Sequence, residues 1–302
     1  MNEIFLDVES GGSYITFDTE SNALLSGESI TFWGWYPPLP NVIWPRLSLE
    51  LVDSGGNIMF ETVNPHPART QPLSAGNAYY FYADFDGAQL RFIGILTDPR
   101  DGNTYQTVAI DNQVWMAENL KYLPSVVGST IASDTDPYYY VYDYEGTDVE
   151  VAKDEENYTT YGVLYNWPAA MAGSASSNAN PSAVQGICPA GWHLPSEAEW
   201  DQLIDFLGDR YDAGGKLKAI GTMYWEDPNE GATNEAGFKA LPGGYTGLGD
   251  YFEELGTQGY WWSATENTSE LSWSSEMNYD DDEARVSGNY KQLAYSVRCV
   301  KD

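Results

Sequence analysis

The chain has 302 residues, of which 45 are Asp or Glu and 14 are Lys or Arg, so its formal net charge at pH 7 is −31. A surface this acidic repels a nucleic-acid backbone and an anionic membrane, and we expect neither as a partner. Apolar residues make up 42% of the chain, which argues against disorder, and no apolar run reaches the ~18 residues that a membrane-spanning helix needs. The length is typical of two domains.

Residues 1–96 have the pattern of an all-β domain. Short apolar or alternating runs follow one another between turn residues: "EIFLDV", "SYITFD", "SITFWGW", "RLSLELV", "NIMFET", "AYYFYAD" and "LRFIGIL". Strands at this spacing predict an immunoglobulin-like β-sandwich. The segment contains no Cys, so the disulfide of antibody domains is excluded here.

The stretch "LTDPRDGN" is the expected boundary, and we assign residues 97–302 to a second domain of different character. "YQTVAIDNQVWMAENL" predicts a hairpin with a tight Asp111-Asn112 turn, followed by a short helix. The acidic, Tyr-rich residues 127–158 predict a long surface loop, and "YGVLYNWPAAM" predicts a helix that contains Pro168.

A second predicted helix begins at Ser196. Ser196 with Glu199 three residues later forms a capping-box pattern, and Gly208 is placed to end the helix. The apolar stripe expected to be buried consists of Trp200, Leu203, Ile204 and Leu207. The carboxylates expected in the first turn and on the exposed face are Glu197, Glu199, Asp201 and Asp205.

Beyond residue 220 the chain is rich in Gly, Trp and Tyr, with the strand-like runs "GFKALPG", "GYWWSATE", "LSWSSEMNY", "EARVSG" and "YSVRCVKD". They predict an irregular, loop-rich sheet with few helices. The fold class of the whole chain is therefore α+β, with an all-β N-terminal domain.

The motifs "DGNTYQTVAIDNQVWMAENL", "YGVLYNWPAAM", "CPAGWHLPSEAEWDQL", "GFKALPGGY", "YWWSATE" and "SVRCVKD" occur in this order. Together they resemble the Fibrobacter succinogenes major paralogous domain family (FISUMP) over about residues 98–302. The resemblance implies a C-type-lectin-like fold and an exported protein of the kind found on Bacteroidetes cell surfaces, often as lipoproteins. The N-terminal part is only generically similar to β-sandwich and fimbrillin-like modules.

Cys188 and Cys299 are the two cysteines of the chain. In the C-type-lectin-like fold a disulfide recurs between the region of an early helix and the last strand, so the resemblance implies that these residues are paired. A disulfide would place the protein in an oxidising compartment. The alternative is a free nucleophilic Cys188 assisted by His193. We interpret His193 as a packed turn residue, because no second His lies at metal-ligand spacing.

An acidic cluster in "MNYDDDEAR" is the candidate calcium site. Five oxygen-bearing side chains lie between two strand-like segments: Asn278, Asp280, Asp281, Asp282 and Glu283. Ca²⁺ takes six to eight oxygen ligands, but the EF-hand pattern fails because Glu283 stands where its Gly should be. The alternative is an acidic hairpin tip that resists edge pairing.

Aromatic side chains in the same half of the chain are the candidate ligand-binding surface. A platform for sugar rings could be formed by Trp261, Trp262, Trp273 and Tyr279. Core packing is the alternative for them. Because neighbouring strand residues point to opposite faces, only one of Trp261 and Trp262 can face a given groove.

No nucleophile elbow, phosphate loop or zinc ligand set is present, so the sequence predicts a protein that is not an enzyme. We predict an exported binding or adhesion protein with a lectin-like head for a glycan or protein ligand. A fimbrial or surface-assembly subunit is the alternative, and a carbohydrate hydrolase is a third. The expected location is the cell surface or the outer membrane, extracellular or periplasmic, with membrane contact only through a lipid anchor upstream of Met1.

Overall fold

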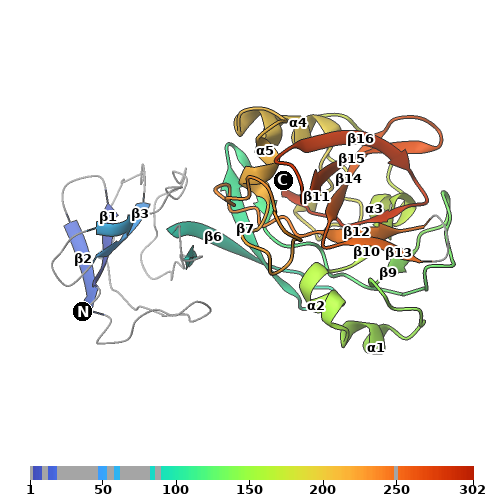
Figure 1. Ribbon diagram of the computed structural model, residues 1–302, viewed down its shortest axis with the longest axis horizontal. Coiled ribbons are helices and arrows are strands. Elements are labelled where there is room, and N and C mark those ends of the chain that lie inside the picture. Colours follow the sequence, from blue (N-terminus) through green and yellow to red (C-terminus); the bar gives the residue numbers. More distant parts are fainter. Residues whose placement is uncertain are drawn as a thin grey trace. The chain divides into compact units, whose positions relative to one another are not determined.

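The computed structural model describes residues 3–8, 13–18, 47–52, 58–61, 82–85, 90–247 and 251–302 (Figure 1). The chain divides into two compact units, Met1–Gly94 and Ile95–Asp302. The assignment of residues 1–96 and 97–302 to separate domains stays a prediction.

The first unit consists, in its described residues, of antiparallel strands. Their bounds are β1 Glu3–Val8, β2 Ser13–Asp18, β3 Leu47–Val52, β4 Ile58–Glu61 and β5 Tyr82–Phe85. The strand β6 (Leu90–Thr97) begins in this unit and ends in the second one. β1 lies between β2 and β3, and β4 follows β3 at the edge, in the order β2-β1-β3-β4. Strands β1–β4 fall within the predicted runs, and β5 and β6 each end one residue beyond theirs. The run "SITFWGW" lies outside the described residues, and the immunoglobulin-like sandwich stays a prediction.

The second unit begins with the predicted hairpin. Strands β7 (Thr104–Ile110) and β8 (Gln113–Met116) pair antiparallel around Asp111, whose φ of 52° suits the tight turn. The short helix expected after β8 does not form. The backbone of that segment is used in long-range bonds instead, since the N–H of Ala117 donates to Gln106 and that of Leu120 donates to Val297. Two short strands extend the sheet beyond β8: β18 (Val300–Lys301) pairs with β8, and β11 (Trp192–His193) pairs with β18.

The segment expected to be one long loop contains secondary structure. Its elements are β9 Tyr139–Tyr140, α1 Val149–Lys153 and α2 Glu156–Tyr161. The side chain of Asp148 accepts hydrogen bonds from the N–H groups of Glu150 and Val151 and so begins α1. The predicted helix at 161–171 is shorter than expected: β10 (Leu164–Asn166) comes first, and α3 (Trp167–Met171) starts with Pro168 in its first turn, where its missing N–H does no harm.

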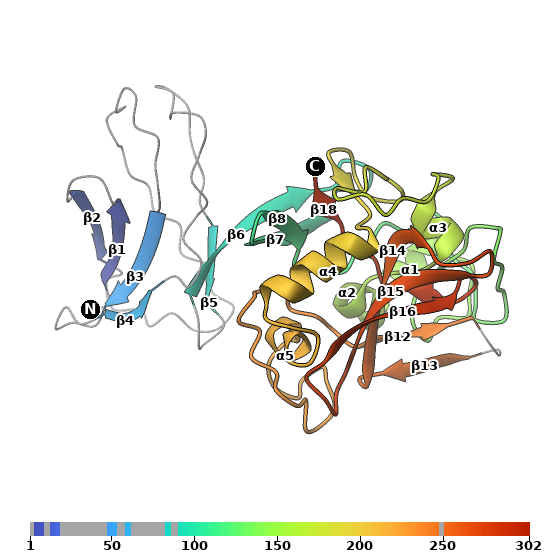
Figure 2. The same cartoon turned by 90° about the horizontal axis from the view of Figure 1, so that it is seen from above.

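A second sheet joins β9 and β10 to three strands from the last sixty residues of the chain. Its order is β13-β12-β17-β10-β9, with β12 Gly243–Thr246, β13 Phe252–Leu255 and β17 Ala294–Tyr295. A third sheet consists of β14 Gln258–Glu266, β15 Leu271–Asn278 and β16 Ala284–Tyr290 in sequential order. Helix α4 (Glu197–Phe206) packs against this third sheet, and the short α5 (Ala213–Leu217) packs against β16 (Figure 2). The run "GFKALPG" forms an isolated bridge at Ala240, and only its last residue, Gly243, belongs to a strand, β12. Helix α5 was not predicted.

Helix α4 has the predicted capping box. The Ser196 hydroxyl accepts from the N–H of Glu199, and the Glu199 carboxylate accepts from the N–H of Ser196. Trp200, Leu203 and Ile204 are buried as expected. Glu199 lies in the first turn, as predicted, but it is not on the exposed face. The residue is 1% exposed, and its carboxylate accepts hydrogen bonds from the buried N–H groups of Ser182 and Ser196.

The buried apolar residues form separate clusters within the second unit. One cluster surrounds the disulfide between Cys188 and Cys299, whose Sγ atoms are 2.06 Å apart. This bond confirms the pairing. Another cluster joins α4 to the third sheet through the aromatic rings of Trp115, Trp200, Phe238 and Trp261, whose centroids lie 4.7–6.4 Å apart in the contacting pairs. The described part of the chain is thus β-rich and mainly antiparallel.

Candidate functional site

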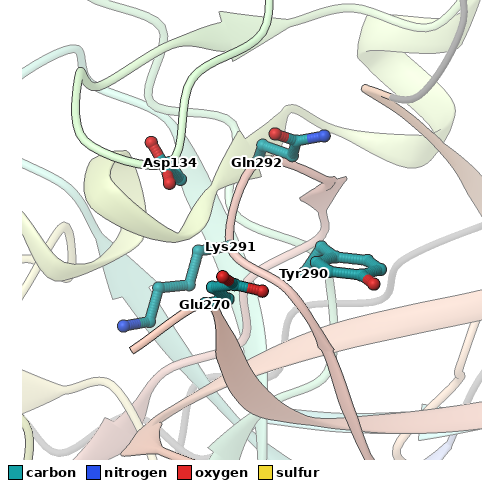
Figure 3. A pocket seen from close by; sticks show the side chains of 5 residues that line it. All are labelled: Asp134, Glu270, Tyr290, Lys291 and Gln292. Atoms are coloured by element: carbon teal, nitrogen blue, oxygen red, sulfur yellow. The ribbon is translucent and has the colours of Figure 1, made fainter. Parts of the chain in front are cut away.

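A small hollow of about 190 Å³ lies where separate loops of the second unit meet. It is lined by Asp134, Glu270, Tyr290, Lys291 and Gln292 (Figure 3). Asp134 comes from the loop before β9, Glu270 from the turn between β14 and β15, and the other three from the end of β16 and the turn after it. The lining is therefore assembled by the fold and not by one continuous motif.

Asn166 fixes the loop that carries Asp134. This residue is fully buried at the end of β10, and its amide nitrogen donates to the carbonyls of Ser133 (2.8 Å) and Asp136 (2.7 Å). Its amide oxygen accepts from the N–H of Tyr138 (2.8 Å) and from the N–H of Ala169, where it also caps α3. One side chain thus positions both a helix and one wall of the hollow.

Lys291 fixes the opposite wall. Its ammonium donates to the Glu266 carboxylate (2.7 Å) and to the carbonyl of Ser269 (2.9 Å), and it lies 4.7 Å from the centre of the Trp167 ring. The N–H of Lys291 also donates to the carbonyl of Glu270 at 3.0 Å. These contacts hold the turn that contains Glu270 against the turn after β16.

The hollow offers the groups that bind a polar ring. Tyr290 is 50% exposed, and Asp134 and Glu270 are exposed as well. An aromatic face binds the apolar face of a sugar ring, while carboxylates and the Gln292 amide can hydrogen-bond to hydroxyl groups. Chemically, this arrangement can bind an uncharged polyhydroxylated group.

The stacking surface predicted from the sequence is partly wrong. Trp261 and Trp262 are fully buried, and their indole N–H groups donate to Asn119 Oδ1 (2.9 Å) and to the carbonyl of Tyr165 (2.7 Å). They are core residues, because both faces of β14 are covered within the second unit. Trp273 and Tyr279 are partly exposed, and neither lines the hollow.

The acidic cluster lies at the connection between β15 and β16, as expected. Asp281 pairs with Arg285 (2.7 Å), and Glu283 contacts the same guanidinium at 3.1 Å. In the described part of the chain no group of three or more His, Cys, Asp or Glu side chains is arranged to hold a metal ion. Calcium at Asn278, Asp280, Asp281, Asp282 and Glu283 stays a prediction and takes no part in the function proposed below.

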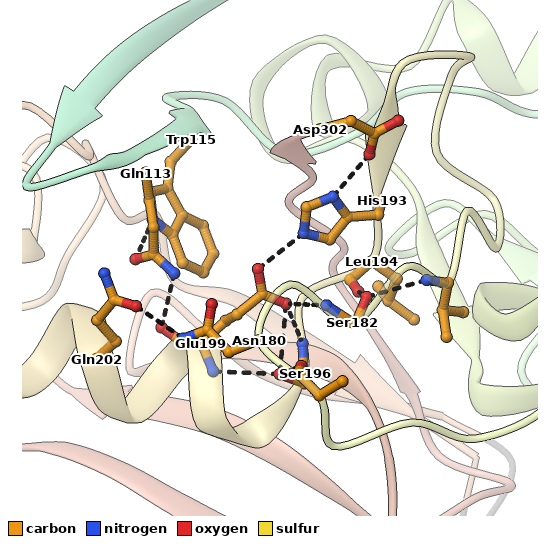
Figure 4. Close-up of polar contacts among 12 residues, drawn as sticks. Gln113, Trp115, Asn180, Ser182, His193, Leu194, Ser196, Glu199, Gln202 and Asp302 are labelled. Atoms are coloured by element: carbon orange, nitrogen blue, oxygen red, sulfur yellow. Dashed lines mark hydrogen bonds and ion pairs between the residues drawn. The ribbon is translucent and has the colours of Figure 1, made fainter.

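His193 is a buried member of a polar network that reaches the exposed Asp302 (Figure 4). Its Nε2 lies 2.8 Å from Glu199 Oε1, and its Nδ1 lies 2.8 Å from Asp302 Oδ1. The other oxygen of Glu199 accepts from the N–H groups of Ser182 (2.9 Å) and Ser196 (3.0 Å). Burial lowers the pKa of His193, but the hydrogen bonds and charges of Glu199 and Asp302 outweigh burial and leave the pKa raised above its ordinary value.

This network is structural. The His193 side chain is only 2% exposed and both ring nitrogens are engaged, so no substrate reaches the ring. The alternative of a nucleophilic Cys188 assisted by His193 is wrong, because Cys188 is in the disulfide. His193 lies in β11 and not in a turn, and it connects that strand to α4 and to the chain end.

A second, wider hollow of about 510 Å³ runs along the exposed face of α4. Its lining residues are Asp111, Ala198, Asp201, Gln202, Asp205 and Phe206. Burial, and then the neighbouring charge of Asp205, raises the pKa of Asp201 above its ordinary value. The predicted exposed carboxylates of α4 thus line an acidic surface beside Phe206, which is 55% exposed.

The residues of the smaller hollow were missed by sequence reasoning. Asp134, Glu270 and Gln292 come from loops without a common spacing or motif. The available signal was Lys291, a rare basic residue in an acidic chain, two positions before the apolar run "LAYSV". A cation next to an apolar, buried run needs anionic partners from other segments, which indicates that loops pack together there.

Comparison with known proteins identifies one family. A family model described as the Fibrobacter succinogenes major domain matches residues 108–301. Searches of curated proteins and of solved structures found no match. The matched range contains both cysteines, helix α4 and the whole third sheet.

The second unit is a β-rich domain closed by one disulfide, which indicates a non-cytoplasmic protein. The chain belongs to the Fibrobacter succinogenes major domain family, which points to a surface protein. No helix in the described ranges is long and apolar enough to cross a membrane.

Proposed function

We propose that the chain is an exported surface-binding protein, without catalytic activity, that binds a glycan at the hollow lined by Asp134, Glu270 and Tyr290–Gln292. The observation that carries the proposal is the exposed Tyr290 ring beside carboxylates and an amide in one concave place. Sites of this kind are concave and combine an aromatic surface with a few oriented polar groups.

The charge of the lining defines the ligand further. Glu270 and Asp134 are exposed carboxylates, whereas the ammonium of Lys291 is already engaged by Glu266. An anionic sugar would be repelled by these carboxylates and by the net charge of −31. We therefore favour a neutral sugar, bound by stacking and hydroxyl hydrogen bonds.

Family membership and the disulfide support surface exposure. A disulfide persists in oxidising compartments outside the cytosol, where a surface-binding protein acts. The lectin-like character of the domain and an attachment to the outer membrane by a lipid anchor are parts of this proposal.

A glycan array probed with the whole chain tests the proposal. We expect binding to a restricted set of neutral glycans, and Tyr290→Ala should weaken binding about tenfold by removing the stacking surface. Tyr251→Ala is the matched control, because Tyr251 is 58% exposed but does not line the hollow. The control should bind like the wild type.

Three outcomes would overturn parts of the proposal. Absence of binding to every glycan removes the carbohydrate function and leaves protein adhesion, or a structural role in a fimbrial assembly that filament formation would reveal. Equal loss in both Tyr variants removes the hollow as the site. Cleavage of a bound glycan would show an enzyme.

A further inference from the structure

Lys218 is a fully buried lysine at the C-terminal end of α5. Its ammonium donates to three backbone carbonyls, those of Glu230 (2.8 Å), Asn278 (2.9 Å) and Asp281 (2.7 Å). The centre of the Trp225 ring lies 5.4 Å from Nζ. Two of the three carbonyls belong to the acidic connection between β15 and β16, so one side chain gathers that segment around a positive charge.

The backbone around Lys218 is packed too closely for a side chain at several positions. A Cβ at Gly214 would overlap the carbonyl of Glu283, and one at Gly231 would lie 2.6 Å from the Cβ of Asp282. The N–H of Gly215 donates to the Asp282 carbonyl at 3.1 Å, and that of Glu230 donates to Tyr279 at 2.8 Å. The glycines thus let α5 and residues 229–231 approach the acidic segment.

Negative charges face the ammonium from both segments. The carboxylates that act on it are those of Asp280, Asp281, Asp282 and Glu230. Burial lowers the pKa of Lys218 to about 8, while these carboxylates raise it, so the ammonium is charged at neutral pH. Asp281 is also paired with Arg285 at 2.7 Å.

From this geometry we infer that residues 230 and 278–282 form a cation site whose occupant is the chain's own Lys218 ammonium. Backbone carbonyls and nearby carboxylates are the ligands that hard cations take, and three carbonyls match the three donors of an ammonium. The acidic segment is then fastened without a metal ion. It differs from a solvated acidic hairpin, since its backbone oxygens converge on a buried charge.

The wild-type chain gives the first test. Thermal unfolding is followed in a chelating buffer and again with added CaCl₂ at equal ionic strength. We expect the same midpoint in both, because the ammonium already occupies the place of the cation. A rise of the midpoint that is specific to Ca²⁺ and that alters amide exchange in 278–283 would overturn the inference.

A set of variants gives the second test. Lys218→Ala should speed the exchange of the Glu230 and Gly215 amides about a hundredfold, since a charged buried donor is lost. Propylammonium, which replaces the deleted part of the side chain, should slow that exchange again, and 1-propanol should not. Lys216→Ala is the matched control, because its ammonium contacts Leu207 and Asp212 and not the acidic segment.

The outcomes separate a cation site from simple filling of space. Equal rescue by propylammonium and 1-propanol would show that only volume matters. Unchanged amide exchange in Lys218→Ala would show that the ammonium does not fasten the segment. If Lys218→Ala does not fold, Lys218→Met and Lys218→Arg replace it: the arginine variant should retain slow exchange and the methionine variant should lose it.

Discussion

At the scale of single residues, buried charged and polar side chains connect segments that are far apart in the chain. Arg298 is fully buried, and its guanidinium donates to Asn119 Oδ1 (3.0 Å) and to the carbonyls of Lys239 (2.8 Å) and Phe238. It also lies 4.1 Å from the centre of the Phe238 ring. Burial lowers the pKa of Arg298 to about 9. Such a residue specifies which segments meet, because a misplaced neighbour would leave a buried charge without acceptors.

His193 makes the stability of the protein depend on pH. Since the folded-state pKa is raised above the unfolded value of about 6.5, the network stabilises the fold fully below that pH. This contribution is lost as the pH rises through the folded-state pKa. We expect the urea midpoint of the wild type to fall over this range, and that of His193→Gln to change less.

His66 supplies the control for this measurement, because it is the other histidine of the chain. His66→Gln should keep the wild-type dependence on pH. If His193→Gln and the wild type follow parallel curves between pH 6 and 9, the network carries no proton-linked stability.

At the scale of elements, α4 and the last strand organise the second unit. The capping box fixes where α4 begins, and Glu199 extends the cap to His193 and thereby to β11 and the chain end. The disulfide ties the segment before β11 to the residue that precedes β18. Hydrogen bonds and the disulfide therefore link the first turn of α4, strand β11 and residues 299–302.

The disulfide closes a sequence separation of 111 residues. The chain-entropy relation for a loop of this size gives about 4–5 kcal/mol of stabilisation, a large part of the total for an ordinary domain. We expect the paired change Cys188→Ser and Cys299→Ser to lower the free energy of unfolding by about 4 kcal/mol. Equilibrium urea unfolding measures this.

Reduction of the wild type is the control for that pair of substitutions. Wild type treated with a reductant should unfold at the same urea concentration as the double serine variant, and the reductant should not affect the variant. A double variant as stable as the oxidised wild type would contradict the expected role of the bond.

At the scale of the whole molecule, local secondary structure was predictable from the sequence, whereas contacts between distant segments were not. Ser196 and Glu199 revealed the start of α4 through a spacing of three residues, and Asp111-Asn112 revealed the β7–β8 hairpin. The pairing of Cys188 with Cys299 came from resemblance to a family. No spacing showed that Asp302 would reach His193 across 109 residues.

The candidate site was hidden for the same physical reason. Asp134, Glu270 and Gln292 are polar residues in loops, and any such residue in an acidic chain has a similar local pattern. Their meeting depends on Asn166 and Lys291, whose partners are known only once the strands are paired. Likewise, neighbouring strand residues such as Trp261 and Trp262 point to opposite faces, and the sequence did not show that both faces of β14 are covered.

The net charge of −31 predicts a dependence of stability on salt. Like charges repel more strongly in the compact state than in the unfolded chain, so screening should favour folding. Raising NaCl from about 0.01 to about 0.1 M shortens the Debye length from about 30 to about 10 Å. We expect the thermal midpoint to rise by several degrees over this range in differential scanning calorimetry.

Choline chloride at the same ionic strength should give the same rise, because screening does not depend on the identity of the cation. A rise with sodium alone would indicate specific ion binding, and a fall with both salts would show that attractive ion pairs such as that of Arg285 with Asp281 outweigh the repulsion.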